Sequence, residues 1–284
     1  MDYSALGEKM EPVVVHGCKF GDGIPKICVP IIGRSASEII KEAEFIQNEA
    51  QKLERQYASS DICVSVIEVR ADYFDGVANN SELIEMLRRL RKIFFNRLLL
   101  FTYRSEEEGG NLRHDRAENM VGDIYDWVIS SGLVDMIDIE LMSGNYYVVR
   151  MTTKAHEAGI TCVLSNHDFE KTPRDDKTVE MLHNMEILGG DILKCVSTPK
   201  NEFDVRRVME LCKKVTEERL FNNNIRHPVV MISMGALGRI TRISGRETGS
   251  AFTFASVRAG QESAPGQLAL QEMFEIFSKP EKKK

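Results

Sequence analysis

The chain lacks the features that mark several classes of protein. Its six cysteines are scattered, with no C-x-x-C pair, so we predict neither a disulfide framework nor a zinc site. Apolar runs such as Leu98–Phe101 are far too short to span a bilayer. The first residues, Met1–Lys9, do not show the basic-then-apolar order of a signal peptide. We therefore expect a reducing, cytoplasmic setting and no membrane partner.

An excess of positive charge is also missing. The net charge is −6 and the pI about 5.7, which argues against general affinity for nucleic acid or anionic membranes. The basic segment Lys279–Lys284 is short, and we interpret it as a solvated tail. Hydrophobic residues make up 43% of the chain and charged residues 28%, as in an ordinary globular protein with a sizeable core. No linker-like stretch divides the chain, so we predict one domain over residues 1–284.

Segments typical of strands and of amphipathic helices alternate along the chain. The predicted strands are Lys26–Ile32, Ile62–Arg70, Leu98–Tyr103, Val134–Leu141, Ile160–Ser165, Ile192–Val196, Pro228–Ser233 and Ala251–Phe254. The predicted helices are Ser35–Tyr57, Ser81–Phe95, Asp115–Ser131, Tyr146–Ala158, Asp175–Leu188, Glu202–Phe221, a weaker piece at Met234–Ile240, and Gln267–Phe277. We expect Ser81 to cap its helix and Gly159 to end the helix before the fifth strand.

Eight such βα units predict an α/β fold, a single (β/α)8 TIM barrel. The segment Val13–Gly23, within an N-terminal extension over residues 1–25, is expected to form a short hairpin that closes the bottom, with Gly21–Gly23 as its turn. A doubly wound open sheet is the main alternative. The first strand is followed by Ile32-Gly-Arg-Ser35 and not by a Gly-rich dinucleotide fingerprint, which disfavours that alternative.

One charged residue stands inside an apolar strand. Lys194 lies in Asp191-Ile-Leu-Lys-Cys-Val196, between a Gly-Gly stop and a Ser-Thr-Pro breaker. An ammonium buried there loses solvation, which favours its neutral, nucleophilic amine. The preceding strand ends at His167, so the two residues together indicate Schiff-base chemistry with a proton shuttle. The alternative is a lysine that snorkels to solvent or pairs with a carboxylate.

The other strand ends are polar as well, and barrel enzymes build their sites at those ends. Glu68 and Arg70 alternate along the second strand, either as a structural ion pair or as site residues. His167 and Asp168 could form a capping arrangement, and Arg239 we interpret as a solvated charge. Further candidates follow the remaining strands: Arg104, Glu108, Met234, Arg242, Phe254, Ser263 and Gln267.

In order and spacing, these residues make the chain similar to the type I 3-dehydroquinate dehydratases along nearly its whole length. The matching blocks are Pro25–Gly33, Ile67-Glu-Val-Arg70, Phe101-Thr-Tyr-Arg104-Ser, Glu108-Gly-Gly110, Ser165-Asn-His167-Asp-Phe169, Met231-Ile-Ser-Met234-Gly with the following Arg242, Gly249–Phe254 and Ser263-Ala-Pro-Gly-Gln267. The segment Ala255–Glu262 is a little longer than usual.

The resemblance implies dehydration of 3-dehydroquinate to 3-dehydroshikimate in the shikimate pathway, without metal or cofactor, by a homodimer. By this analogy Lys194 forms an imine with the C3 ketone. His167 removes the C2 proton and protonates the departing C1 hydroxyl in a syn elimination, and Glu108 supports this histidine. The analogy assigns substrate binding to Glu68, Arg70, Arg104, Arg242, Ser263, Gln267, Met234 and Phe254.

Two other functions stay open at this point. A class I aldolase would also use Lys194 but would break a carbon–carbon bond, and for a sugar phosphate it would need a phosphate cradle near Gly235–Gly238. A barrel that only binds a metabolite would need neither a buried amine nor the co-occurrence of Lys194, His167 and Glu108.

Overall fold

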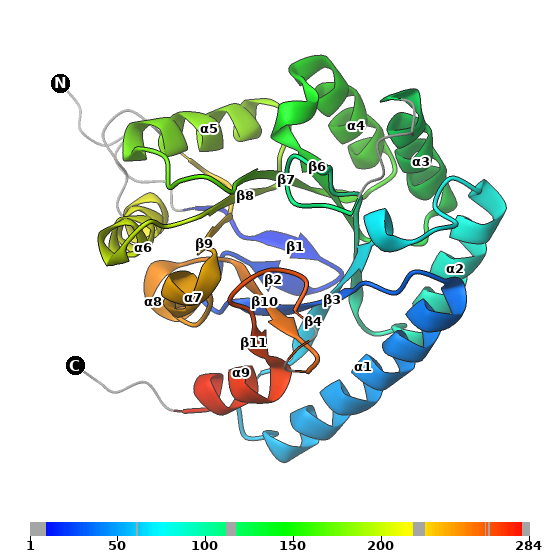
Figure 1. Cartoon of the computed structure of the whole chain (residues 1–284), viewed down its shortest axis with the longest axis horizontal. Helices are drawn as coiled ribbons and strands as arrows, with labels where there is room; N and C mark the ends of the chain where they lie inside the picture. The colour runs from blue at the N-terminus through cyan, green and yellow to red at the C-terminus, as the bar shows by residue number, and fades with distance from the viewer. Residues whose placement is uncertain are drawn as a thin grey trace.

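A curled, mainly parallel β-sheet wrapped by helices forms the body of the molecule (Figure 1). The computed structural model describes residues 10–60, 62–111, 118–217, 225–258, 260 and 262–279. Within these residues the sheet has nine strands in the order β11-β10-β3-β4-β5-β6-β7-β8-β9, and all neighbouring strands in it are parallel. The predicted α/β class and the eight predicted strands are therefore confirmed.

Each strand lies close to its predicted place. The strands are β3 (Lys26–Ile31), β4 (Val64–Arg70), β5 (Leu98–Thr102), β6 (Met136–Glu140), β7 (Thr161–Asp168), β8 (Ile192–Ser197), β9 (Val229–Ser233), β10 (Phe252–Ser256) and the unpredicted β11 (Leu268–Ala269). β7 extends three residues beyond its predicted end at Ser165, because His167 and Asp168 pair in register with Val196 and Ser197 of β8. His167 is therefore held by the sheet and does not lie on a loop.

The predicted N-terminal hairpin is present, but its turn is elsewhere. β1 (Val13–Val15) and β2 (Cys18–Phe20) pair antiparallel around His16-Gly17, both of which have positive φ, 44° and 84°. The prediction of a turn at Gly21–Gly23 is wrong, because those glycines lie in the connection from β2 to β3. A two-residue turn with positive φ at both positions matches the twist of a hairpin.

The helices follow the strands in sequence. They are α1 (Ala36–Gln56), α2 (Asn80–Ile93), α3 (Glu118–Ser131), α4 (Asn145–Glu157), α5 (Asp175–Ile187), α6 (Glu202–Glu217), α7 (Gly235–Gly238), the unpredicted α8 (Gly245–Thr248) and α9 (Leu270–Phe277). The cap of α2 corrects a prediction: Asn79 accepts the N–H of Glu82, and Ser81 lies inside the first turn and donates to Asn79. The predicted starts and ends at 115–117 and 218–221, and the tail from 280, lie outside the described residues.

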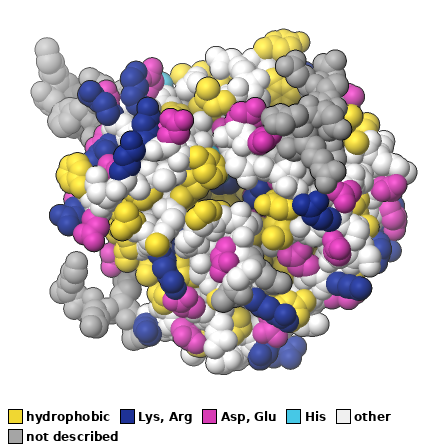
Figure 2. All heavy atoms as spheres, in the orientation of Figure 1, with side chains coloured by type: hydrophobic (Ala, Val, Ile, Leu, Met, Phe, Trp, Pro, Cys, Tyr) yellow, Lys and Arg dark blue, Asp and Glu magenta, His cyan; other side chains and the backbone are white. Residues whose placement is uncertain are grey.

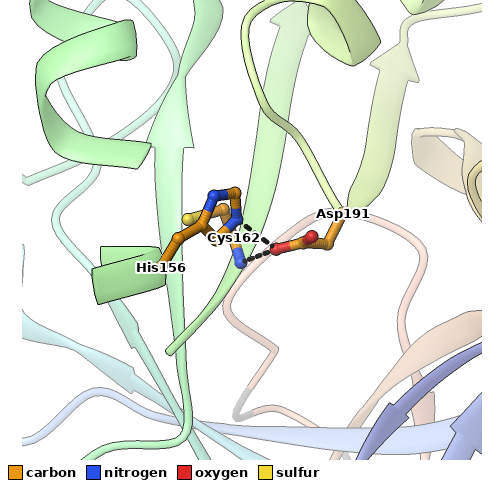
Figure 3. A group of neighbouring side chains, drawn as sticks. All are labelled: His156, Cys162 and Asp191. Carbon is orange, nitrogen blue, oxygen red and sulfur yellow. Dashed lines mark hydrogen bonds and ion pairs between the residues drawn. The ribbon is translucent and has the colours of Figure 1, made fainter. Parts of the chain in front are cut away.

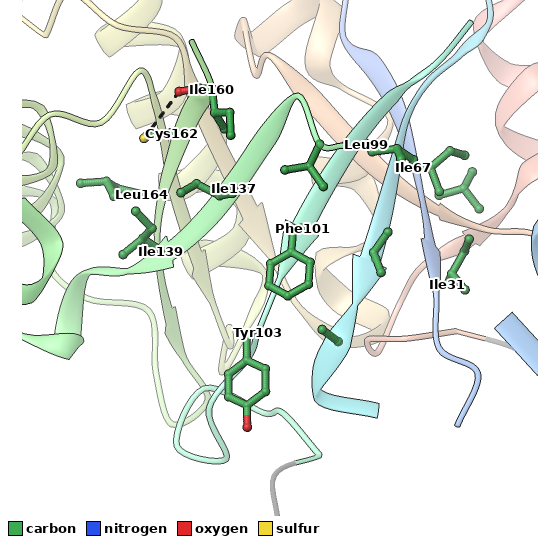
Figure 4. Close-up of a cluster of buried hydrophobic side chains, with 14 of the residues drawn as sticks. Ile31, Ile67, Leu99, Phe101, Tyr103, Ile137, Ile139, Ile160, Cys162 and Leu164 are labelled. Atoms are coloured by element: carbon green, nitrogen blue, oxygen red, sulfur yellow. Dashed lines mark hydrogen bonds between the residues drawn. The ribbon is translucent and has the colours of Figure 1, made fainter. Parts of the chain in front are cut away.

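The two faces of the sheet carry different sets of side chains. Alternate residues face the helices and form one continuous apolar core, shown in Figure 4 for strands β3 to β7. The other alternate residues face the inside of the curl, where Phe20 of the hairpin packs edge-on against Phe252 at 6.0 Å between ring centroids. Because Phe20 is fully buried there, the hairpin seals the end of the curl at which the strands begin.

On the inner side of the sheet each of five strands begins with an apolar residue and continues with a polar one, and only on β8 does an apolar residue, Val196, follow. The inner series are Val66-Glu68-Arg70 on β4, Leu100-Thr102-Arg104 from β5, Met136-Asp138-Glu140 on β6, Val163-Ser165-His167 on β7 and Ile192-Lys194-Val196 on β8. The polar groups therefore gather at the ends where the parallel strands finish. Among the described residues, no helix is long and apolar enough to cross a membrane.

Candidate active site

One cavity of about 100 Å³ opens where the inner polar residues gather. Every site residue predicted from the sequence contributes to its lining: Lys194, His167, Glu108, Glu68, Arg70, Arg104, Arg242, Ser263, Gln267, Met234 and Phe254. In Figure 2, basic side chains are visible at depth near the middle of this face, between hydrophobic side chains. The structure thus brings together residues from five strands, β4, β7, β8, β9 and β10, and from the segments that follow β5, β9 and β10.

The Lys194 amine is buried but has a partner. Lys194 is 3% exposed, and its Nζ donates to Asp138 Oδ2 at 3.0 Å. The ammonium also lies 4.8 Å from the centre of the Phe254 ring. The pairing with a carboxylate that the sequence left open is therefore present, and Lys194 does not snorkel to solvent. The pair directs Nζ across the inside of the curl, from β8 to β6.

Asp138 is held as a carboxylate by two cations. Its Oδ1 accepts from Arg104 Nη2 at 2.8 Å and from Ser165 Oγ at 2.6 Å. Burial opposes the charged form, but Arg104 and Lys194 outweigh it and lower the pKa of Asp138 to about 2. A carboxylate with so low a pKa is a poor proton acceptor. It is suited to fixing the position of the Lys194 amine.

Arg104 is the centre of this buried network. Its Nη1 donates to Ser165 Oγ at 2.9 Å, to Glu140 Oε1 at 3.0 Å and to Glu108 Oε2 at 3.3 Å. Burial opposes the charge of the guanidinium, but the carboxylates of Asp138, Glu140 and Glu108 raise the pKa of Arg104. Because its donors are occupied by three carboxylates and a hydroxyl, Arg104 orders the site more than it offers a free cation to a ligand.

His167 and Glu108 form a hydrogen-bonded dyad. The distance from His167 Nδ1 to Glu108 Oε2 is 2.7 Å. Burial, with Arg104, Lys194 and Arg70, lowers the pKa of His167 well below its usual range. Burial also raises the pKa of Glu108 to about 8, against the effect of Arg104. The dyad therefore keeps its carboxyl proton at neutral pH, and this proton can move along a short bond.

The neighbours of the dyad behave as side-chain alternation requires. Asp168 Oδ1 accepts the N–H groups of Glu170 and Lys171 at 2.9 Å each, so Asp168 fixes the loop after β7 and does not orient His167. Glu106 and Glu107 are exposed, whereas Glu108 is 5% exposed. One member of an acidic run is thus directed into the cavity.

Glu68 and Arg70 have separate partners. Arg70 makes a bidentate pair with Asp72, with Nε–Oδ1 and Nη2–Oδ2 distances of 2.9 Å, and Glu68 Oε1 accepts from Thr102 Oγ1 at 2.9 Å. A Glu68–Arg70 ion pair, which the sequence left open, is not found among the described residues. Asp72 follows β4 in the short 3-10 helix Ala71–Tyr73 and fixes the direction of the Arg70 guanidinium.

Among the described cations that line the cavity, Arg242 is the one without a carboxylate partner. It is 2% exposed, donates from Nη2 to the carbonyl of Pro265 at 3.1 Å, and leaves its Nε without a hydrogen bond among the described residues. Burial lowers the pKa of Arg242 to about 10. A buried guanidinium with a free donor at a cavity wall is arranged to receive an anion.

The loop beside Arg242 is folded on itself. Ser263 and Gln267 bond each other twice, from Gln267 Nε2 to Ser263 Oγ at 2.9 Å and from Ser263 N to Gln267 Oε1 at 3.0 Å. The loop also rests on α7, because Gly235 N donates to Pro265 O at 3.2 Å. Gly266 has a φ of +80°, and a Cβ there would lie 2.3 Å from Gly235 O, so only glycine allows this approach. Met234 and Phe254 complete the lining as buried apolar walls.

Three polar residues of this network were not predicted from the sequence: Asp138, Glu140 and Ser165. The first two could have been predicted from side-chain alternation, because Met136, Asp138 and Glu140 are alternate residues of the strand predicted over Val134–Leu141. Ser165 is fully buried between Arg104 and Asp138. Its contact with Asp138 depends on the register Glu140↔Ser165 between β6 and β7, which sequence periodicity does not specify.

Comparisons with known proteins agree on one family. The family model described as type I 3-dehydroquinase matches residues 27–284. The 3-dehydroquinate dehydratase of Clostridioides difficile strain 630 is 36% identical over 266 residues, 94% of this chain and 96% of that protein. One from Listeria monocytogenes serotype 4b is 33% identical over 94% of this chain and 97% of its own length.

Solved structures show the same similarity. The crystal structure of the C. difficile type I enzyme with covalently modified comenic acid has a TM-score of 0.81 and 34% identity, and the match covers 94% of this chain and 96% of that one. The structure of 3-dehydroquinate dehydratase from Geobacillus kaustophilus has a TM-score of 0.84 and 28% identity over 95% of this chain and 96% of that one.

Proposed function

The chain belongs to the type I 3-dehydroquinase family, and from this premise we propose that Lys194, His167 and Glu108 carry its reaction. The protein is a hydro-lyase of the shikimate pathway that dehydrates 3-dehydroquinate to 3-dehydroshikimate. A Schiff-base mechanism is characteristic of this family. The observation that carries the assignment is the buried Lys194 amine, which lines the same 100 Å³ cavity as the His167–Glu108 dyad.

The first step is imine formation at C3 of the substrate. Asp138 holds the Lys194 nitrogen in the cavity, and with a pKa of about 2 it does not take the lysine proton. His167 takes that proton once the dyad has released the Glu108 proton, because its imidazole is neutral at physiological pH and lines the same cavity. The amine then attacks the C3 carbonyl, and water leaves with protons returned by the dyad. The iminium draws electrons from C2 and so acidifies the C2 proton.

The second step is the elimination itself. His167 removes the C2 proton and later protonates the departing C1 hydroxyl, and one residue can serve both atoms only if they lie on the same face of the ring. The 2.7 Å bond to Glu108 keeps the imidazole in position and stabilises the proton that it carries between the two atoms. Hydrolysis of the imine then releases the product and restores the Lys194–Asp138 pair.

We infer the substrate contacts from whether each arginine of the cavity is already paired with a carboxylate. Arg70 and Arg104 already face carboxylates, and we assign them with Glu68 to the ring hydroxyls. Arg242 lacks a carboxylate partner among the described residues, and we assign it to the substrate carboxylate. Ser263 and Gln267 can exchange their mutual hydrogen bonds for bonds to the substrate, and Met234 and Phe254 exclude water from the imine.

The alternative functions lose support for specific reasons. Aldol cleavage of a sugar phosphate would require an anion cradle at α7, after β9, but α7 has only four residues and the N–H of Gly235 already donates to the carbonyl of Pro265. The named relatives also favour dehydration over aldol cleavage. Mere metabolite binding gives no reason to bury a lysine opposite a histidine–carboxylate dyad.

Three further parts of the account are proposals. We infer that the curled sheet closes as a (β/α)8 barrel between β9 and β10, which the bond from Ala251 N to Val229 O at 2.8 Å supports. We propose a homodimer and a cytoplasmic location from the family resemblance and the scattered, unpaired cysteines. Light scattering on the purified protein tests the dimer.

The test of the function is direct. We expect the purified chain to convert 3-dehydroquinate into a product with the ultraviolet absorbance of a conjugated enone. Folded protein that produces no such absorbance would contradict the assignment. A Lys194→Ala variant that retains full activity would contradict the proposed role of the amine but not the reaction.

A further inference from the structure

A second group of chemically active side chains lies away from the cavity, near the ends at which strands β7 and β8 begin (Figure 3). His156 stands in the last turn of α4, Cys162 is the second residue of β7, and Asp191 directly precedes β8. One nitrogen of His156, the Cys162 sulfur and one Asp191 oxygen all lie within 4.8 Å of one another. We propose that these three residues form a binding site for a thiophilic divalent cation, with Zn²⁺ as the best match.

The donor set selects the class of metal. Zn²⁺ accepts thiolate, imidazole and carboxylate ligands in tetrahedral geometry, whereas Mg²⁺ and Ca²⁺ prefer oxygen ligands. Three protein ligands leave the fourth position to water. That position can face solvent, because the His156 side chain is 43% exposed while Cys162 is fully buried behind it.

The present distances require only small movements. His156 Nε2 lies 2.9 Å from Asp191 Oδ2, and ligand atoms around tetrahedral zinc are separated by about 3.5 Å. The Cys162 thiol has only long contacts, at 4.0 Å to the carbonyls of Thr152 and Ile160, so its rotation toward the metal breaks no strong bond. On binding, the thiol releases its proton to solvent and coordinates as the thiolate.

The surrounding backbone holds two of the ligands in place. Asp191 Oδ2 also accepts the N–H of Cys162 at 2.7 Å, while Oδ1 has no hydrogen bond among the described residues and is free to coordinate. A capping role for Asp191 alone would explain its bond to Cys162 but not a histidine and a thiol at the same carboxylate.

A cation at this site would tie α4 to the starts of β7 and β8. These are the strands that carry His167, near the far end of β7, and Lys194, the third residue of β8. Asp191 precedes Lys194 by three residues, or roughly 10 Å of strand, so the metal would not touch the substrate. We therefore expect the cation to stabilise the fold without taking part in the dehydration, and the inference is independent of the proposed function.

The experiment uses the full chain, freed of metal by a chelator and titrated with Zn²⁺ against a chromophoric competitor, and with Co²⁺ as a spectroscopic probe. We expect one equivalent of metal per chain, a sulfur-to-cobalt charge-transfer band, and a rise in Tm of roughly 5 °C at zinc concentrations far above Kd. Absence of the charge-transfer band would overturn the proposal, because it would show that the thiol is not a ligand.

Two histidine variants distinguish metal binding at this site from nonspecific binding by exposed histidines. His156→Gln changes an exposed side chain, so the variant should fold and should bind zinc more than about tenfold more weakly. His183→Gln, at an exposed histidine of α5, is the matched control and should bind as the wild type does. Equal affinity in wild type and His156→Gln would overturn the proposal. The Cys162→Ala variant should lose the sulfur-to-cobalt charge-transfer band. Retention of this band in the variant would also overturn the proposal.

Discussion

The buried, unpaired charge of Arg242 predicts opposite effects of one substitution on stability and on catalysis. The variant is Arg242→Met, which keeps an unbranched side chain of similar reach and removes the charge. Burial lowers the pKa of Arg242 to about 10, well below its usual range, and at about 1.36 kcal/mol per pKa unit this corresponds to about 3 kcal/mol against folding. The cost applies in full below pH 10, where the guanidinium is charged in both the folded and the unfolded state, so it is present at pH 7.

Removal of the charge should stabilise the folded variant, but the loss of a hydrogen bond offsets part of this stabilisation. The bond from Arg242 Nη2 to Pro265 O is lost, at about 1 kcal/mol. The net expectation for the protein without ligand is a free energy of unfolding that is unchanged or up to about 2 kcal/mol higher. Binding should suffer, because loss of one partner of a buried charge pair costs about 2–5 kcal/mol, which is a fall in kcat/KM of roughly 30-fold or more.

Urea denaturation at pH 7 and steady-state kinetics with 3-dehydroquinate measure the two effects. Arg239→Met is the control, because Arg239 is an exposed neighbour paired with Glu272 and is expected to change either quantity little. A destabilised Arg242→Met variant with an unchanged kcat/KM would refute the reasoning, since it would show that Arg242 supports the fold and does not bind substrate.

Three further predictions concern the network around the amine. Asp138→Asn leaves Lys194 and Arg104 with an uncompensated charge, so the free energy of unfolding in urea should fall by about 3–5 kcal/mol; a loss below 1 kcal/mol would contradict the network. In the wild type, kcat/KM should rise with pH to a plateau above about 8, because the dyad must release the Glu108 proton before His167 can accept one from C2, and Glu108→Gln should abolish that limb. An identical pH profile in wild type and variant would exclude this origin. His167→Ala should still form the imine but turn over slowly, so the covalent species should accumulate in intact-mass spectra; normal kinetics would remove the assigned role.

The sequence predicts the fold well because its signals are local. Alternation and helix periodicity locate all eight main strands, and the inward period of two explains why Lys194 faces the same cavity as His167. The hairpin turn was misplaced because His16 adopts positive φ, which is unusual for a residue other than glycine and has no sequence signature.

Pairing inside the site could not be predicted in the same way. Whether Lys194 is free or bonded depends on Asp138, which lies 56 positions earlier and two strands away, and that choice is made by sheet register. Arg70 also has a partner that was not predicted, Asp72 and not Glu68, and here the 3-10 helix that follows β4 brings the two side chains together. Residue types at strand ends thus indicate which groups meet, while three-dimensional packing decides which of them are paired and which, like Arg242, are left for the substrate.

The central claim is the covalent bond between Lys194 and the substrate. The purified chain is incubated with 3-dehydroquinate and sodium borohydride, which reduces an imine to a stable amine, and the digested protein is analysed by peptide mass spectrometry. We expect loss of activity and a substrate-derived mass on the peptide that contains Lys194, and we expect neither effect in the absence of substrate. Turnover in the absence of an adduct, or an adduct confined to another lysine, would contradict it.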